Sequence, residues 1–150
     1  MSCRIYPLFS SQLVAFLDVE SRDEVLTKLV DLLYAEGKVD SKESFLRAIM
    51  ERERVVSTAV GMGVAIPHAK VPGYEKFFIA IGLLKKGVDW GAIDHVPVRL
   101  VFMIGGPDDK QTEYLQLLST LTSAIKEEER RKAILKAALP EKIVLLFEDY

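Results

Sequence analysis

The segment from Arg52 to Ala69 gathers side chains that suit the binding and transfer of an anionic group. It contains an arginine, hydroxyl side chains, two glycines and a histidine that follows a proline, in the order Arg52-Glu53, Ser57-Thr58, Gly61, Gly63 and Pro67-His68. Glycine lets a backbone approach a ligand, Ser and Thr add hydroxyl donors, and Arg offers a planar, permanently charged fork that fits a phosphoryl group. The spacing therefore indicates an anion site.

His68 is the candidate nucleophile of this segment. A neutral imidazole is nucleophilic at one nitrogen when an acceptor holds the N–H of the other, and its unperturbed pKa of about 6.5 leaves much of it neutral near pH 7. Pro67 fixes φ just before the histidine and so restricts how the ring is presented. Two interpretations stay open from the residues alone: His68 accepts a phosphoryl group, or it is a loop histidine with a structural hydrogen bond.

Other site chemistries find less support in the sequence. One cysteine, Cys3, and two histidines, His68 and His95, fall short of a zinc pattern, so no metal is predicted. Gly61 and Gly63 lack the third glycine of a dinucleotide fingerprint, and the chain has no Gly-Lys-Ser/Thr phosphate loop, so no cofactor is predicted. A hydrolase is disfavoured because no Ser-His-Asp or paired-carboxylate set is present. We expect Cys3 to be a reduced thiol in a flexible terminus and the chain to be cytoplasmic.

Charge and composition exclude several classes of protein. The 150 residues carry 20 Lys and Arg against 22 Asp and Glu, and this balance gives no basic field for nucleic acid. With 49% hydrophobic residues, the chain is expected to form one globular domain over residues 1–150. The longest uncharged stretch, Val55 to Ala69, is shorter than the roughly 20 apolar residues of a membrane span, and no signal-peptide cleavage pattern follows the N-terminus. Nucleic-acid binding, membrane insertion and secretion are therefore not expected.

Hydrophobic runs and turn residues predict an α/β fold. Phe77–Leu84 and Val98–Ile104 are near-continuous apolar runs typical of central strands covered on both faces, and Gly105, Gly106 and Pro107 are expected to stop the second run. Leu13–Leu17 is predicted to be a buried strand. Val88–Trp90 is predicted to be a short edge piece. The aromatic residues predicted to be buried in the core are Phe77, Phe78, Trp90 and Phe102.

Apolar residues at helical spacing predict helices in most of the remaining sequence. Ser21 and Glu24 form a capping box that opens the first helix, and Gly37 is placed to end it. The third helix is expected to bury Leu115, Leu118, Leu121 and Ile125, and the fourth to present its charges to solvent. The last helix is preferred over a terminal strand. The predicted helices cover residues 21–37, 40–54, 112–125, 127–138 and 140–147.

The string RERVVSTAVGMGVAIPHAK, residues 52–70, resembles the signature of the type-2 enzyme IIA proteins of the bacterial phosphotransferase system. These are the mannitol and fructose group, which includes the nitrogen-regulatory IIA proteins. Weaker similarity continues through GAIDHVPVRLVFMI and YLQLLSTL, so the resemblance covers nearly the whole chain. It implies an α/β domain with a mixed sheet of about five strands and helices on both sides, an architecture that buries both sheet faces.

The resemblance also implies roles for individual residues. His68 is the residue that carries the phosphoryl group, and Arg52 helps to bind it. The residues Ser57, Thr58 and Gly63 border the site. His95 matches no family position of this kind and is expected to be a surface histidine.

Tyr114 is the departure from the family pattern. Family members usually have a second active-site histidine before a Leu-x-x-Leu stretch, whereas this chain has Tyr114 before Leu115-Gln116-Leu117-Leu118. A phenol can donate a hydrogen bond to a phosphoryl oxygen, but it cannot carry positive charge near pH 7. By its place in the helix Tyr114 should face His68. The alternative is that Tyr114 is only a half-buried helix residue.

The implied partners are proteins. The donor is a histidine-phosphorylated, HPr-like small carrier protein. The acceptor is a IIB component, or the phosphorylation state itself controls target proteins in nitrogen-regulatory members. Only a IIA-length unit is seen, which favours a free-standing nitrogen-regulatory IIA. The alternatives are a non-transferring regulatory module of the same fold and a fructose- or mannitol-specific IIA.

Overall fold

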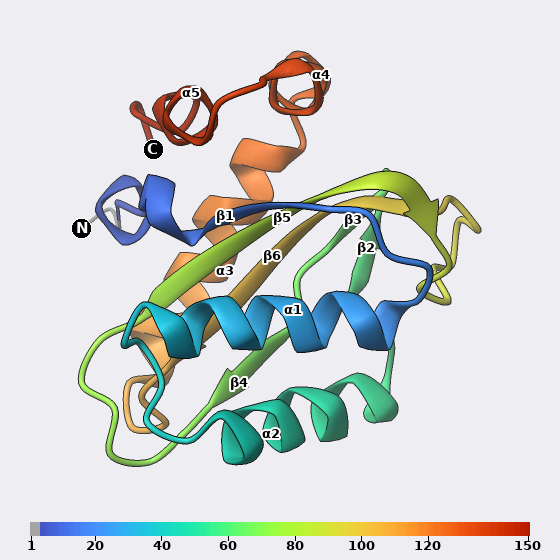
Figure 1. Ribbon diagram of the computed structural model, residues 1–150. Coiled ribbons are helices and arrows are strands. Elements are labelled where there is room, and N and C mark those ends of the chain that lie inside the picture. Colours follow the sequence, from blue (N-terminus) through green and yellow to red (C-terminus); the bar gives the residue numbers. More distant parts are fainter. Residues whose placement is uncertain (1–3) are drawn as a thin grey trace.

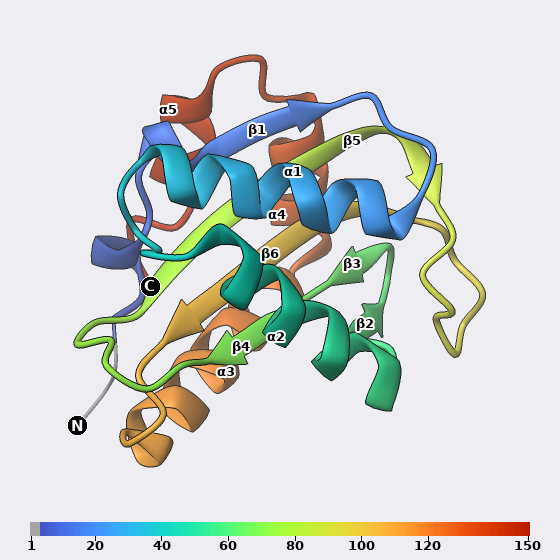
Figure 2. The ribbon, with the colours of Figure 1, turned by 60° about the horizontal axis from the view of Figure 1, so that its bottom comes forward.

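The computed structural model describes residues 4–150 and is built around one mixed β-sheet (Figures 1 and 2). The six strands follow the order β1-β5-β6-β3-β2, and β4 also pairs with β6. The strands are β1 (Val14–Leu17), β2 (Ala59–Gly61), β3 (Val64–Ala65), β4 (His68–Lys70), β5 (Phe78–Val88) and β6 (Val98–Gly106). The predicted α/β class is confirmed.

The two central strands are those predicted from the apolar runs. β5 and β6 are antiparallel neighbours, with Ile79 opposite Ile104. Both strands are buried along most of their length because helices cover both faces of the sheet. β6 continues through Gly105 and Gly106, two residues beyond the predicted end at Ile104, and Pro107 follows its last residue. A Cβ on Gly105 would lie 2.4 Å from the ring of Phe78, so this glycine makes room for an aromatic side chain.

The helices lie in two layers, one on each face of the sheet. α1 and α2 cover one face, and α3 with the two C-terminal helices covers the other (Figures 1 and 2). The Ser21 hydroxyl accepts from the Glu24 N–H as the capping box predicts, and the last segment is helical as preferred. The helices are α1 (Arg22–Ala35), α2 (Lys42–Val55), α3 (Gln111–Ile125), α4 (Glu128–Lys136) and α5 (Pro140–Leu145), with short 3₁₀ turns at Tyr6–Leu8 and Ser11–Leu13.

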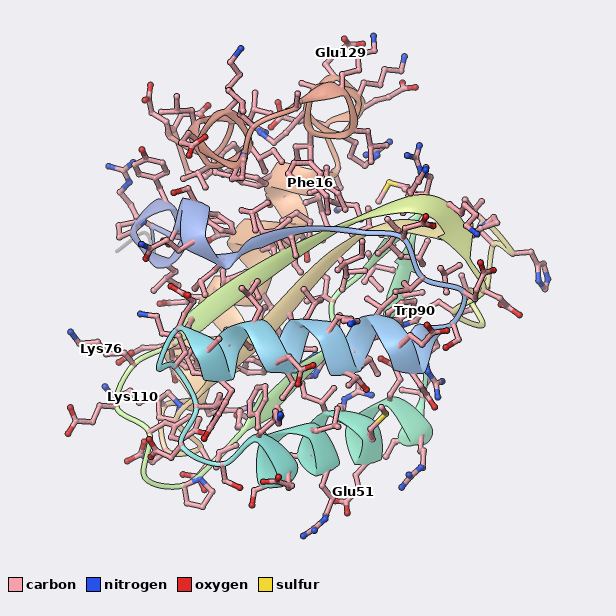
Figure 3. All side chains as sticks on the ribbon, in the orientation of Figure 1. Phe16, Glu51, Lys76, Trp90, Lys110 and Glu129 are labelled. Carbon is pink, nitrogen blue, oxygen red and sulfur yellow. The ribbon has the colours of Figure 1, made fainter. Side chains whose placement is uncertain are left out.

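The layers enclose two apolar clusters separated by the sheet. Along β6 the side chains alternate, so that Val101 and Met103 face α1 and α2 while Phe102 and Ile104 face α3. Phe78 and Trp90 are buried in the first cluster as predicted, whereas Phe77 is only partly buried. The charged outer face of α4 agrees with its predicted exposure, and Figure 3 shows Glu129 pointing away from the molecule.

Three predicted elements differ from the structure. The sheet has six strands instead of about five, because three short strands form within residues 59–70, where no regular run was expected. β1 is an edge strand in which only Val14 is buried, and Phe16 is 50% exposed. The short edge piece is absent as a separate strand: Val88 is the last residue of β5, and Trp90 lies in the following loop.

One predicted helix face is also rotated. Leu115 is 54% exposed, and the first buried residue of α3 is its neighbour Tyr114. The buried stripe continues through Leu117 and Leu121, which are spaced at one and two helical turns from Tyr114. Cys3 lies outside the described residues. Within residues 4–150, no helix combines the length and the apolar character needed to cross a membrane.

Candidate active site

His68 and Arg52 meet where the end of α2 packs against β4. His68 is the first residue of β4 and is paired with Ile104 of the central strand β6, which fixes its backbone. Arg52 lies in the last turn of α2, and its Nη1 donates to the carbonyl of Val56 at 2.9 Å. Its Nε donates to Nε2 of His68 at 3.2 Å. The guanidinium is therefore held against the imidazole by the end of the helix.

The hydrogen bonds of His68 define its protonation state. A guanidinium only donates, so Nε2 must offer its lone pair to Arg52. Nδ1 lies 2.8 Å from the carbonyl oxygen of Ile66, which only accepts, so the ring proton is on Nδ1. Burial lowers the pKa of His68, and the charges of Arg52 and Lys70 lower it further against the opposing hydrogen bond to Ile66. The ring is thus neutral near pH 7 with a nucleophilic Nε2.

Tyr114 faces the same imidazole from the other side of the site. It lies in the first turn of α3, and its ring centroid is 5.6 Å from that of His68, the placement expected from the sequence. Phe77 stacks on the phenol ring, with the two ring centroids 6.0 Å apart. Tyr114 is 5% exposed, and its buried hydroxyl has no hydrogen-bond partner within the described chain. Burial raises the pKa of Tyr114, so the phenol keeps its proton as an unused donor.

Ser57 and Thr58 shape the loop before the site, and their hydroxyls are engaged elsewhere. The Thr58 N–H and hydroxyl both donate to the buried carboxylate of Glu53, at 2.7 and 2.6 Å. The Trp90 indole donates to the Thr58 oxygen at 3.3 Å, and the Ser57 hydroxyl donates to the Trp90 carbonyl at 2.6 Å. The expected hydroxyl donors for an anion are therefore used to join α2, this loop and the loop after β5.

Gly63 and His95 are not brought to the site. The carbonyl of Gly63 accepts from the N–H groups of Arg99 and Leu100. Leu100 lies four residues before Ile104 on β6, which places Gly63 about 13 Å along the strand from His68. Gly63 has φ of 75° and serves the turn between β2 and β3. His95 is exposed.

Glu53 and Lys70 have no role assigned by the sequence motif. Glu53 is 3% exposed and anchors Thr58, although the motif shows it only as a neighbour of Arg52. Lys70 lies two residues after His68 in β4. Because side chains two residues apart in a strand share one face, the sequence could have indicated that Lys70 lies near His68. Its Nζ is 4.9 Å from the Tyr114 ring centroid and donates to the side chain of Gln111 at 2.5 Å.

We expect Glu53→Ala to destabilise the fold by about 1–3 kcal/mol, because the two buried donors of Thr58 lose their acceptor. Urea unfolding of the wild type and of Glu53→Ala would measure the change in the free energy of unfolding. Thr58→Val is the matched control: it removes the hydroxyl while keeping the side-chain shape, so one bond remains and the loss should be smaller. Equal stability of Glu53→Ala and the wild type would contradict the anchoring role.

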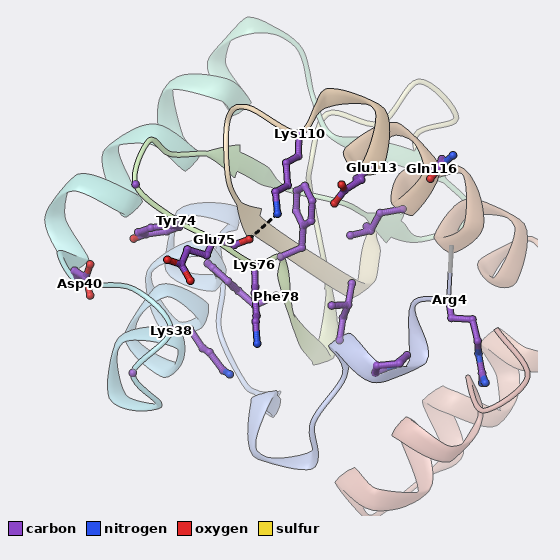
Figure 4. Close-up of a pocket in the computed structure, with 16 residues that line it drawn as sticks. Arg4, Lys38, Asp40, Tyr74, Glu75, Lys76, Phe78, Lys110, Glu113 and Gln116 are labelled. Carbon is purple, nitrogen blue, oxygen red and sulfur yellow. Dashed lines mark hydrogen bonds between the residues drawn. The ribbon is translucent and has the colours of Figure 1, made fainter. Parts of the chain in front are cut away.

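A separate cavity of about 890 Å³ is lined in part by the start of α3 (Figure 4). It is bounded by the N-terminal segment, the loop after α1, residues 73–78 and the start of α3. Lys76 and Lys110 extend into this region, and the Lys110 ammonium donates to the Glu75 carbonyl. Phe77 forms part of the wall, whereas His68, Arg52 and Tyr114 do not line the cavity.

The fold and the site define an α/β domain that presents a neutral histidine beside an arginine. The family model for "Phosphoenolpyruvate-dependent sugar phosphotransferase system, EIIA 2" matches residues 7–150. The chain belongs to this family and is a phosphotransferase-system component.

Relatives of the chain include sugar-specific and regulatory proteins. It is 36% identical over 136 residues to the fructose-specific EIIABC component of Bacillus subtilis, covering 89% of this chain but only 21% of the relative. It is 35% identical to the fructose-specific EIIA component of Haloferax volcanii, covering 78% of this chain and 76% of the relative. It is 30% identical to a nitrogen regulatory protein of Bradyrhizobium diazoefficiens, with coverage of 79% and 76%.

Solved structures share the fold. The nitrogen regulatory protein IIA-Ntr of Neisseria meningitidis superposes with a TM-score of 0.89 at 24% identity, covering 95% of this chain and 98% of that one. The IIA mannitol enzyme of Escherichia coli, in its complex with phosphorylated IIB, superposes with a TM-score of 0.80 at 18% identity, covering 95% and 98%.

Proposed function

We propose that the chain carries a phosphoryl group on Nε2 of His68. The observation that supports this most directly is the orientation of the ring: Nδ1 is protonated against Ile66, and the Nε2 lone pair faces Arg52. A histidine-phosphorylated donor gives up its N–P bond as the new Nε2–P bond forms. Arg52 then moves its Nε hydrogen bond from Nε2 to the phosphoryl oxygens, where its planar fork stabilises their charge.

The same geometry favours onward transfer. Because Nδ1 keeps its proton, the phosphorylated ring carries a positive charge next to the P–N bond. A positively charged imidazole is a better leaving group than a neutral one, so the phosphoryl group stays transferable. When it departs, the ring returns to the neutral tautomer with no proton to move at Nδ1. The Ile66 carbonyl accepts the hydrogen bond from Nδ1–H before, during and after the transfer.

The proposed partners follow from the family. The donor is a histidine-phosphorylated, HPr-like carrier protein. The second partner is a IIB protein that accepts the phosphoryl group, supported by the E. coli IIA structure in complex with phosphorylated IIB, or a target protein regulated by the phosphorylation state. Phosphoenolpyruvate, after which the family is named, is a cytosolic metabolite, and we place the chain in that compartment as one domain over residues 1–150.

A nitrogen-regulatory role is our preferred assignment within the family. It is supported by the fold match to IIA-Ntr and by the nitrogen regulatory relative. A fructose-specific IIA is the second candidate, favoured by the higher identity of the two fructose relatives. A regulatory module without efficient transfer is the third candidate. It is supported by Tyr114, because a neutral phenol stabilises a phosphoryl group less than the histidine usual in the family.

The experiment that tests the proposal is incubation with the phosphorylated carrier protein and radiolabelled phosphate. We expect label that is stable in alkali, lost in acid and located by peptide mapping on the segment that contains His68. A chain that binds the carrier and takes no label would support the regulatory module instead. Label on a different peptide would overturn the site.

Tyr114 is expected to tune the lifetime of the phosphorylated state. Tyr114→Phe keeps the ring and removes the donor, so the rate of acceptance or the lifetime of phosphorylated His68 should fall by roughly 2–10-fold, the value of one neutral hydrogen bond. The unphosphorylated Phe variant should be at least as stable as the wild type, because a buried donor without a partner is lost.

Tyr114→His gives the opposite test. An imidazolium makes a charge-assisted bond that is about twice as strong as a neutral one, so the rate or lifetime should rise, most clearly below about pH 7. The measurements are phosphorylation rates and decay half-lives at pH 6, 7 and 8. If His, Tyr and Phe give the same values at every pH, position 114 serves only packing.

A further inference from the structure

We infer that Lys70 is a second cation that binds the phosphoryl group on His68 and supplies the charge that a neutral Tyr114 cannot. This inference rests on the proposed function and names a further positioning residue at the same site. Lys70 follows His68 by two residues within β4, and residues two apart in a strand point to the same face. Their Cα atoms are about 7 Å apart, a distance that a four-carbon side chain can span.

The position of the ammonium supports this role. Nζ of Lys70 lies 4.9 Å from the centroid of the Tyr114 ring, and the ring of His68 lies 5.6 Å from the same centroid. Tyr114 is therefore in contact with both the acceptor imidazole and the ammonium. The buried hydroxyl of Tyr114 has no hydrogen-bond partner among the described residues, so the site already contains one donor that a phosphoryl oxygen can use.

Lys70 carries a charge that no carboxylate neutralises within residues 4–150. None of the ion pairs found there includes Lys70. Its Nζ donates to the amide oxygen of Gln111, which is a neutral acceptor from the start of α3. Lys70 is exposed and its side chain is flexible, so the ammonium can exchange that amide for a phosphoryl oxygen at small cost.

Charge balance gives the reason for a second cation. A phosphoryl group carries a charge of about −1.5 to −2 near pH 7. Arg52 and the phosphorylated ring each contribute one positive charge, whereas the nearby carboxylate of Glu53, whose charge acts on His68, contributes one negative charge. With the ammonium of Lys70 these charges balance the phosphoryl dianion. Without Lys70, the cluster would keep close to one uncompensated negative charge beside a half-buried ring.

The test uses phosphoramidate, which phosphorylates histidine without any docking protein. The P–N bond of its ammonium form breaks, ammonia leaves, and the Nε2–P bond of His68 forms. We compare wild type, Lys70→Met, Lys70→Arg and, as the matched control, Lys76→Met, which removes an exposed lysine from the loop before β5. Lys70→Met should reduce the phosphorylation rate by roughly tenfold, since a charge-assisted hydrogen bond is lost, while Lys70→Arg should recover most of it.

A second measurement separates charge from structure. ³¹P NMR of the phosphorylated chains measures the pKa at which the phosphoryl monoanion becomes the dianion. This pKa should be higher in Lys70→Met than in the wild type, because the cation that favours the dianion is absent. Lys76→Met should behave as the wild type in both measurements. If Lys70→Met matches the wild type in rate and in its ³¹P titration while the wild type is labelled, the role of Lys70 is wrong and the proposed function stands. If the wild type takes no phosphate from phosphoramidate or from the carrier protein, both fail.

Discussion

A His68→Ala chain should accept no acid-labile phosphate from the phosphorylated carrier, whereas the wild type should become labelled. The expectation follows from the site, where His68 has the only imidazole that lies against a guanidinium within the described chain. Alanine leaves Arg52 and Tyr114 in place but offers no nitrogen to form a bond with phosphorus. Because the phosphoryl group is held covalently, no neighbouring donor can replace the missing atom.

The fold should survive this substitution. His68 is half-buried at the start of a short strand, and its side chain makes two hydrogen bonds, one to the Ile66 carbonyl and one from Arg52, each worth about 1 kcal/mol. His95→Ala is the matched control, because His95 is exposed and lies outside the site. It should be labelled as the wild type is. Label retained by His68→Ala at the same urea midpoint, or lost in His95→Ala, would refute the assignment of His68.

The elements with regular patterns are predictable from the sequence. β5 and β6 follow from long apolar runs, and α1 follows from a capping box and a glycine stop, because these signals are local. β2, β3 and β4 are two or three residues long, too short to show a period. They exist because β3 and β4 pair with the central strand β6, a contact between segments far apart in the chain.

The same distinction holds within the site. The placement of Arg52 and Tyr114 beside His68 could be anticipated because the family pattern relates these three positions, although the residue type at 114 departs from it. The directions of the Ser57 and Thr58 hydroxyls could not, since the Ser57 hydroxyl donates to the carbonyl of Trp90, more than thirty residues away, and the Thr58 hydroxyl donates to the buried carboxylate of Glu53. The hydroxyls were therefore expected at the anion, although they bind Glu53 and the Trp90 loop.

Arg52→Lys should slow phosphoryl transfer by roughly 10–100-fold although the positive charge is kept. Arg52 uses two separate donors, Nε toward His68 and Nη1 toward the Val56 carbonyl, and the planar group fixes the angle between them. A lysine has one ammonium, which can reach the helix end or the phosphoryl group but cannot hold both. The loss of one charge-assisted hydrogen bond, about 1.5–3 kcal/mol, accounts for the expected factor.

Rates measured at several salt concentrations distinguish geometry from charge. A role based only on long-range charge would be screened by salt equally in both chains, so Arg52→Lys would match the wild type throughout. A role based on the fork predicts a deficit that persists at every salt concentration. Arg54→Lys, an exposed arginine at the same helix end, should transfer at the wild-type rate. Equal rates for wild type and Arg52→Lys would show that Arg52 is an ordinary surface arginine, and the phosphoryl group would then need a different ligand.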